Sequence, residues 1–321
     1  MLKFITRIPL FTAVAVLAAG GFVNEGLAGE IWVTNMISGN VMVFDSDSRE
    51  KIATIETGAG AHNIVISRDG TRALVSNVGA HTVSIIDATA KKVIATVAAG
   101  KKTHDVSISP DGTRAMASSV GDSTITLIDV ANGKALYTKK FGKKAMMSVF
   151  AADNKHVYVV DAVEARISKV DLKTGSVEKS FPGGKGIMAF VPSKNWKTAW
   201  ITAPKANQIS HIDIVSGKVI ATVDIPDSPD GLVLGSDGSR AYVVQRVADS
   251  IAIVDTGTGK IVKSEFLGEK PDMLAISPDG KTLYVTIRGE DKLMLVSTSD
   301  LSTIAEVKTG KQPHGVAYRG G

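Results

Sequence analysis

The amino-acid sequence predicts an all-β protein, a seven-bladed β-propeller with four antiparallel strands in each blade. Three observations predict this fold: a 42-residue repeat, short β-branched runs within each repeat, and an incomplete repeat at either end. The repeat is clearest in the residue that follows the third run of each unit. Stepping by 42 residues gives Asp45, Asp87, Asp129, Asp171, Asp213, Asp255 and Ser297. This regular spacing indicates that the units contain no insertions or deletions.

One unit, residues 59–100, shows the expected strands. Its apolar runs are residues 64–66, 73–75, 83–86 and 93–97, and polar or glycine-containing turns separate them. The first turn is Asp-Gly in four of the units: Asp69-Gly70, Asp111-Gly112, Asp237-Gly238 and Asp279-Gly280. The fourth and fifth units carry Asp153-Asn154 and Asn195-Trp196 instead. We therefore expect these two blades to differ on that face.

The incomplete repeats at the two ends complement each other. The first unit begins directly with a second strand, residues 31–34, and residues 314–318 read as a first strand with no unit after it. If the C-terminal strand joins the first blade, the ring closes without an exposed sheet edge. The sequence therefore predicts one propeller domain over residues 29–321.

The first 28 residues read as a secretory leader. Lys3 and Arg7 give a basic start, residues 8–23 are mostly apolar, and residues 26–28 offer a small-x-small cleavage site. An uncleaved membrane anchor is the alternative, although two glycines interrupt a short apolar run. We expect a signal peptide over residues 1–28 and a periplasmic or secreted protein with no membrane span in its mature form.

Composition narrows the classes of function. The 321 residues include no cysteine, which excludes disulfides, thioether-attached haem and thiolate metal ligands. The net charge of +5 comes from basic residues spread through the chain, so a nucleic-acid partner is not expected. The sequence predicts a monomer whose stability comes from packing.

The residue that starts the innermost strand of each blade should lie at the mouth of the central channel. Stepping by 42 residues gives one such residue per blade: His314, His62, His104, Met146, Met188, Asp230 and Asp272. Half of the six histidines of the protein therefore lie in this ring, in adjacent blades. The closed geometry puts neighbouring Cα atoms roughly 7 Å apart, close enough for imidazoles to meet on one ion.

Three interpretations of the ring are open. Imidazole with thioether is a ligand set that copper accepts, and three histidines with water would also suit zinc, so His62, His104, His314, Met146 and Met188 are candidate metal ligands. The same residues could instead line a water-filled channel. A third interpretation is an organic ligand or a haem-like cofactor bound axially by one histidine.

Two arginines should accompany the aspartates of the ring. Arg246 and Arg288 follow the second strands of the blades that carry Asp230 and Asp272. We expect Arg–Asp pairs on that side of the mouth, either as charge balance or as a clamp for an anionic or carboxylate ligand.

The other histidines and the tryptophans carry weaker signals. By position in the repeat, His81 should be an exposed loop residue near the mouth, whereas His156 and His211 should lie outside the ring. Trp196 and Trp200 should pack within the fifth blade, with a partner-docking patch as the alternative.

The repeat resembles a known family. Residues 32–35 (Trp-Val-Thr-Asn), 74–77 (Leu-Val-Ser-Asn) and 284–286 (Tyr-Val-Thr), with Ser-Pro-Asp-Gly at 109–112 and 277–280, are similar to the YVTN family of exported seven-bladed propellers. The resemblance covers residues 30–319. It implies the fold but not one function, because similar repeats occur in surface-layer proteins, periplasmic proteins, propellers associated with quinone-dependent alcohol oxidation and enzyme subunits.

These observations favour an exported binding module whose function lies at the channel mouth. It would bind a small ligand, with copper as the leading ion and zinc as the alternative, or present a docking face to another periplasmic protein. The rival class is an enzyme, an oxidoreductase or lyase component that uses the channel histidines. A third class is a structural surface protein. No catalytic residue is assigned, because no hydrolase or zinc-protease motif is present.

Overall fold

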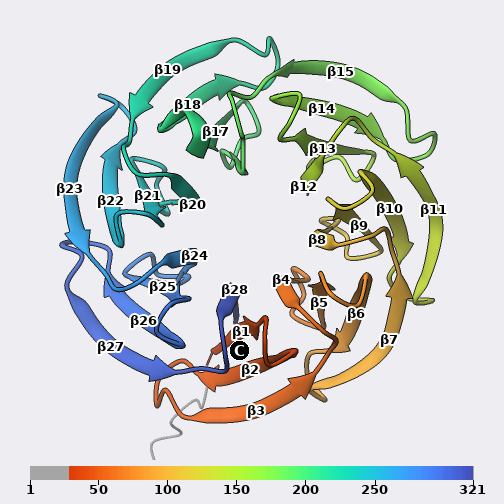
Figure 1. Cartoon of the computed structure of the whole chain (residues 1–321), viewed down its shortest axis with the longest axis horizontal. Helices are drawn as coiled ribbons and strands as arrows, with labels where there is room; N and C mark the ends of the chain where they lie inside the picture. Colours follow the sequence, from red (N-terminus) through yellow and green to blue (C-terminus); the bar gives the residue numbers. More distant parts are fainter. Residues whose placement is uncertain (1–28, 321) are drawn as a thin grey trace, which may run out of the picture.

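Seven four-stranded antiparallel sheets surround a central channel in the computed structural model, which describes residues 29–320 (Figure 1). The predicted leader, residues 1–28, lies outside the described residues. In the first blade the order from the axis outwards is β28 (Pro313–Arg319), β1 (Glu30–Asn35), β2 (Asn40–Asp45) and β3 (Lys51–Glu56). The predicted closure of this blade by the C-terminal strand is therefore confirmed.

The other blades each use four consecutive strands, with the first strand innermost. The second holds β4 (Ala61–Ile66), β5 (Arg72–Asn77), β6 (Thr82–Asp87) and β7 (Lys92–Ala98), and the third holds β8 (Thr103–Ile108), β9 (Arg114–Ser119), β10 (Thr124–Asp129) and β11 (Lys134–Lys140). The fourth holds β12 (Ala145–Phe150), β13 (His156–Asp161), β14 (Arg166–Asp171) and β15 (Val177–Pro182). The fifth holds β16 (Ala189–Pro192), β17 (Thr198–Ala203), β18 (Gln208–Asp213) and β19 (Val219–Asp224).

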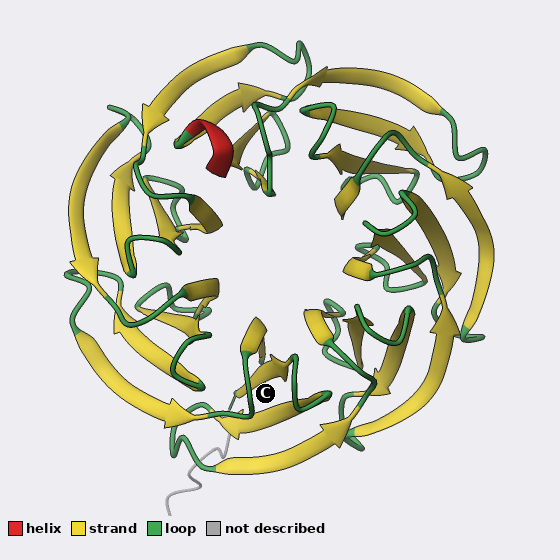
Figure 2. Ribbon diagram, viewed as in Figure 1, coloured by secondary structure: helices red, strands yellow, loops and turns green. Residues whose placement is uncertain are grey.

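The last two blades repeat the pattern. The sixth holds β20 (Pro229–Leu234), β21 (Arg240–Gln245), β22 (Ser250–Asp255) and β23 (Lys260–Phe266), and the seventh holds β24 (Pro271–Ile276), β25 (Thr282–Ile287), β26 (Lys292–Ser297) and β27 (Thr303–Lys308). A 3₁₀-helix, η1 (Pro204–Ala206), lies in the connection between β17 and β18 of the fifth blade (Figure 2). Within residues 29–320 no helix is long and apolar enough to cross a membrane.

The repeated aspartates stabilise the turns between the third and fourth strands. Asp87 Oδ1 accepts hydrogen bonds from the backbone N–H groups of Thr89 and Ala90, at 3.1 and 2.9 Å. The turns that follow the first strands are also alike, even in the blades that lack Asp-Gly. Asn154 and Trp196 both have φ of 56°, in the left-handed region that Gly70 adopts elsewhere. The fourth and fifth blades therefore differ from the others there in side chains and not in backbone conformation.

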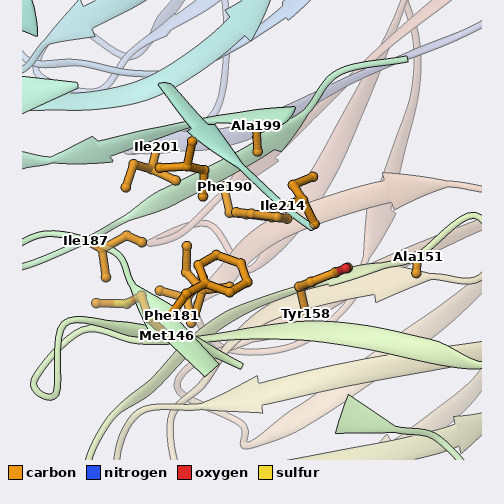
Figure 3. Close-up of a cluster of buried hydrophobic side chains, with 12 residues drawn as sticks. Met146, Ala151, Tyr158, Phe181, Ile187, Phe190, Ala199, Ile201 and Ile214 are labelled. Atoms are coloured by element: carbon orange, nitrogen blue, oxygen red, sulfur yellow. The ribbon is translucent and has the colours of Figure 1, made fainter. Parts of the chain in front are cut away.

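The hydrophobic core lies between neighbouring blades. Figure 3 shows the cluster between the fourth and fifth blades, in which Tyr158, Phe181 and Phe190 pack with Ile187 and Ile201. Each sheet thus buries its two faces against its neighbours, which leaves the ends of the strands to form the two faces of the disc.

Candidate functional site

Three histidines from adjacent blades meet at one mouth of the channel. His62, His104 and His314 each occupy the second position of an innermost strand, β4, β8 and β28. The ring centroids of His62 and His314 lie 3.6 Å apart, and those of His62 and His104 lie 4.3 Å apart. The structure therefore brings the three imidazoles into direct contact.

Burial keeps these imidazoles neutral. His62 and His314 are each 6% exposed. Burial lowers the pKa of both well below the ordinary value, and it lowers the pKa of His104 to about 4. The Nδ1 atoms of His62 and His314 are buried without a hydrogen-bond partner among the described residues. Such atoms are costly unless a water or a ligand satisfies them.

His104 is held by a hydrogen bond that fixes its orientation. Its Nδ1 lies 3.0 Å from the carbonyl oxygen of Met146, so Nδ1 carries the proton and Nε2 keeps its lone pair. The corresponding carbonyl in the second blade, that of His62, is bonded differently, because it accepts a hydrogen bond from the Thr34 hydroxyl of the first blade. The equivalent hydroxyl in the third blade, on Ser118, is buried without a partner. The imidazole of His104 therefore donates to the carbonyl of Met146, which by the pattern of the repeat would accept a hydrogen bond from the Ser118 hydroxyl.

A cavity of about 270 Å³ lies against these rings. Besides the three histidines, its lining includes four of the nine methionines of the protein: Met36, Met147, Met188 and Met273. Thioether sulfur and neutral imidazole nitrogen are both soft or borderline ligands. The cavity therefore concentrates donor atoms suited to a soft cation.

The position of Met146 differs from the expectation. Met146 is 6% exposed and packs in the core between the fourth and fifth blades (Figure 3). Met147 lines the cavity instead. The register shift between Ala145 and Met147 does not explain this difference, because the third blade has the same shift between Thr103 and Asp105 and its His104 lines the cavity. The apolar side chain of Met146 can enter the core between the blades, whereas the imidazole of His104 is held at the mouth by its hydrogen bond. Met188, by contrast, lines the cavity as the repeat predicts.

The expected arginine–aspartate cluster forms on the opposite side of the mouth. Arg246 contacts both Asp230, at 2.7 Å, and Asp272, and Arg288 Nη1 lies 3.4 Å from Asp272 Oδ2. Burial raises the pKa of Asp230 to about 6. Burial lowers the pKa of the Arg246 guanidinium, but the two carboxylates outweigh this effect and the net change is an increase. His314 Nε2, 3.8 Å from Asp272 Oδ2, links this cluster to the histidines.

A second tier of residues completes the lining and was not expected from the sequence. Asn63, Asp105, Met147 and Met273 each follow a ring position by one residue, and all four line the cavity. Asp105 accepts a hydrogen bond from the backbone N–H of Ser148 at 2.9 Å and another from the Asn63 amide. Burial raises its pKa to about 6. The 42-residue step, applied one position further along, would have found this tier.

The remaining histidines lie outside the cavity. His81 is an exposed loop residue that accepts a hydrogen bond from the backbone N–H of Lys102. His211 stacks on Trp200 and borders another cavity. His156 lies 2.6 Å from Asp153 and 3.2 Å from Glu178. These placements agree with the positions of the three residues in the repeat.

One group of carboxylate and imidazole side chains has its ligand atoms close together. Over residues 29–320, His156, Asp171 and Glu178 are the one set of this kind whose ligand atoms all lie within 4.8 Å of one another. Glu178 also pairs with Lys169 at 3.1 Å, so this group is already balanced by protein charges. The channel histidines are not in such a set, and an ion bound there would need the methionine sulfurs or a small approach of the rings.

Comparison with known proteins identifies the family and the fold. The family model of the YNCE-like beta-propellers matches residues 28–151, 139–240 and 233–319. No curated protein matches the sequence. The resemblance of the repeat to YVTN-type propellers is confirmed by the family match and by the seven-bladed structure.

Three solved structures illustrate the breadth of the fold. Hydrazine synthase of Kuenenia stuttgartiensis is 18% identical, with a TM-score of 0.76 over 84% of this chain and 92% of that chain. A putative 6-phosphogluconolactonase of Bacteroides fragilis is 18% identical, with a TM-score of 0.77 over 92% and 99%. The dihydro-heme d1 dehydrogenase NirN, solved in complex with DHE, is 15% identical, with a TM-score of 0.68 over 90% and 74%. At these identities the likeness is one of fold alone.

Proposed function

Since the chain belongs to the family of YNCE-like beta-propellers, whose shared fold defines no single chemistry, we propose that it is an exported binding module for a copper ion at the channel mouth. The observation that carries the proposal is the contact of three neutral imidazoles, of which those of His62 and His314 are buried and that of His104 is half-buried, beside a cavity lined by four methionines. Neutral imidazole and thioether together favour Cu(I), whereas a site for Zn²⁺ would not need the sulfur atoms.

Each part of the cavity has a role in this proposal. His104 would bind through Nε2, because its Nδ1–H donates to the Met146 carbonyl, as metal-ligating histidines commonly do. His62 and His314 supply buried nitrogens that lack protein partners among the described residues. Met147 and Met188 face these rings across the cavity as candidate thioether ligands.

The charge around the cavity is compatible with a cation. Three carboxylates, those of Asp105, Asp230 and Asp272, lie at or beside the cavity. Two guanidinium groups, those of Arg246 and Arg288, lie there as well, so the negative charges outnumber the positive ones. In this proposal the arginines stabilise the walls through their pairs with Asp230 and Asp272, while an anion clamp is the role they would have in a site for an anionic ligand. The predicted leader over residues 1–28 supports export, and the binding module would therefore act outside the cytoplasm.

Metal loading of untagged protein tests the proposal. The protein would be incubated with Cu(I), Cu(II) or Zn²⁺, passed through a desalting column and measured by elemental analysis. We expect retention of about one Cu(I) per chain, with less Zn²⁺, and loss of that copper in His62→Ala and His104→Ala. Absence of retained copper, or retention that both variants leave unchanged, would refute a copper site at the mouth.

An enzyme is the second candidate, and one contact favours it. His314 Nε2 lies 3.8 Å from the carboxylate of Asp272, which places an imidazole beside a carboxylate at the edge of the cavity. An oxidoreductase or lyase component would use this pair with the other channel histidines. The presence of a chromophore in the purified protein, or turnover that His314→Gln abolishes, would favour this function over simple binding.

A further inference from the structure

A second cavity, of about 690 Å³, lies between the fifth and sixth blades. The innermost strands β16 and β20 run from the channel mouth to the other face of the disc, and their far ends border this cavity. The turns that follow these strands also line it, together with Trp200 and His211. The cavity is therefore separate from the histidine site.

The joint between the fifth and sixth blades lacks a hydrogen-bonded bridge that joins the sixth and seventh blades. Between the sixth and seventh blades, Arg240 Nη1 and Tyr242 Oη both donate to the carbonyl oxygen of Thr298, at 3.3 and 3.0 Å. The residues 42 positions earlier are Thr198, Trp200 and Thr256, and all three line the cavity. Threonine is too short to replace the arginine, and tryptophan has no hydroxyl to replace that of tyrosine.

The joint on the other side of the fifth blade is also filled. Tyr158 stacks on Phe190 with ring centroids 5.3 Å apart and on Trp196 at 5.9 Å. The joints on both sides of the open joint are thus filled, whereas a smaller cavity, of about 320 Å³, lies at the corresponding joint between the seventh and first blades.

The lining combines aliphatic walls with polar side chains and two side chains of opposite charge. Val191, Val233, Leu234 and Ile276 form the aliphatic walls. The Lys194 ammonium donates to the backbone carbonyl of Ser236. Asp237 Oδ1 likewise accepts hydrogen bonds from the backbone N–H and the hydroxyl of Ser239, at 2.9 and 2.8 Å.

His211 supplies the distinctive polar group. Its ring is parallel to that of Trp200, with an interplanar angle of 3° and centroids 4.8 Å apart. Burial lowers the pKa of His211, so the imidazole is neutral and offers both a donor and an acceptor. The stack fixes the plane in which these groups point.

We propose that this cavity binds a small, uncharged aromatic molecule bearing a hydroxyl group, whose ring packs against the aliphatic walls while the hydroxyl bonds to His211. The volume lies within the range of small-molecule sites, and the lining holds one cation, Lys194, and one anion, Asp237, so it carries no net charge that would favour an ionic ligand. This inference is independent of metal binding at the channel mouth.

Equilibrium dialysis with 2-naphthol, 2-naphthoate and naphthalene tests the proposal. We expect 2-naphthol to bind with about one site per chain and 2-naphthoate to bind at least about tenfold more weakly. Absence of 2-naphthol binding, or tighter binding of the carboxylate, would overturn the proposed ligand class.

Variants then locate the binding. Thr198→Arg combined with Trp200→Tyr recreates the bridge of the next joint and should weaken 2-naphthol binding at least about tenfold. Gly235→Ser is a smaller change to the lining, and a Cβ there meets its nearest atoms at 3.5 Å, so the side chain fits. This variant should also weaken 2-naphthol binding.

A third variant tests the hydrogen bond alone. His211→Phe keeps the stacked ring but removes the ring nitrogens, so 2-naphthol should bind about tenfold more weakly while naphthalene binds as before. Lys263→Ala, in the exposed outer strand β23, is the control and should change neither the affinity for 2-naphthol nor the affinity for naphthalene. Equal affinity for 2-naphthol in the wild type and in all three cavity variants would place the bound molecule elsewhere and refute the assignment.

Discussion

The imidazoles of His62 and His314 lie in van der Waals contact, with ring centroids 3.6 Å apart, although one belongs to the second blade and the other to the C-terminal strand. This contact depends on the closure of the ring. β28 completes the first blade by pairing with β1, and the same strand carries His314 to the mouth. The pairing of β28 with β1 therefore both closes the propeller and brings His314 into the candidate site.

Removal of the C-terminal strand should disrupt both. Deleting residues 313–321 exposes the edge of β1 and removes Val316, which is 8% exposed in the core. We expect broadened, less cooperative denaturant unfolding and aggregation, measured by circular dichroism and light scattering. Deleting only the residues after Arg319 is the control and should preserve the wild-type transition. Cooperative, soluble behaviour of the longer deletion would contradict this role for β28.

The two adjacent methionines of the fourth blade should behave differently. Met147→Leu removes a cavity thioether and should weaken Cu(I) binding at least about tenfold. Met146→Leu changes a core residue of similar volume and should leave copper affinity unchanged, with a stability cost of less than about 1.5 kcal/mol. Competition with a chromophoric Cu(I) chelator measures the affinity, and urea unfolding measures the stability. Loss of affinity in Met146→Leu alone would contradict the placement of these side chains.

Arg246 should be essential for the stability of the mouth. Arg246→Leu leaves Asp230 and Asp272 buried without their shared cation, which should cost about 3–5 kcal/mol in the free energy of unfolding. Urea unfolding measures the effect. Lys263→Ala breaks an exposed pair with Glu265 and should cost less than about 1 kcal/mol. Similar costs for the two substitutions would show that the buried cluster contributes no more than a surface pair.

Asp105 and His104 should impose opposite pH dependences on stability. Burial raises the pKa of Asp105 from 3.8 to about 6, so the folded state binds this proton more tightly and stability falls as pH rises through that window. Burial lowers the pKa of His104 from 6.5 to about 4, so the unfolded state binds that proton more tightly and stability rises with pH in this window. The two effects partly cancel in the wild type.

Asp105→Asn separates these effects. The amide oxygen still accepts the Ser148 N–H, but the buried charge is gone, so the stability at pH about 8 should increase by about 1–3 kcal/mol. Between pH about 4 and about 6.5 the free energy of unfolding of the variant should rise more steeply with pH than that of the wild type. Urea unfolding across this range measures both. A shallower slope in the variant would show that Asp105 is not the group with the raised pKa.

The fold could be predicted from the sequence because the repeat has a constant length. A period of 42 residues with aspartates in register from Asp45 to Asp255 assigns every strand to a blade, and the unpaired run at 314–318 identifies the closing strand. The same step placed His62, His104, Met188 and Asp230 at the cavity.

The sequence could not reveal features that depend on contacts between blades. The third and fourth blades share the same register shift, yet His104 lines the cavity while the equivalent Met146 packs in the core, so the repeat alone does not show which methionine faces the cavity. The cavity beside Trp200 required a comparison of neighbouring joints, because the absence of a bridge is visible only when the partner residue, Thr256, is in place. The roles of the ring residues remain predictions for experiment.

The most direct test of the central proposal is the Cu(I) affinity of the untagged protein, measured by competition with a chromophoric chelator, in the wild type, His62→Ala and His81→Asn. His81 is an exposed loop histidine outside the cavity, and asparagine tolerates its φ of 63°, so this variant is the matched control. The account predicts one strong site, weakened at least about a hundredfold in His62→Ala and unchanged in His81→Asn. Equal affinity in all three proteins, or no competition for copper by the wild type, would contradict it.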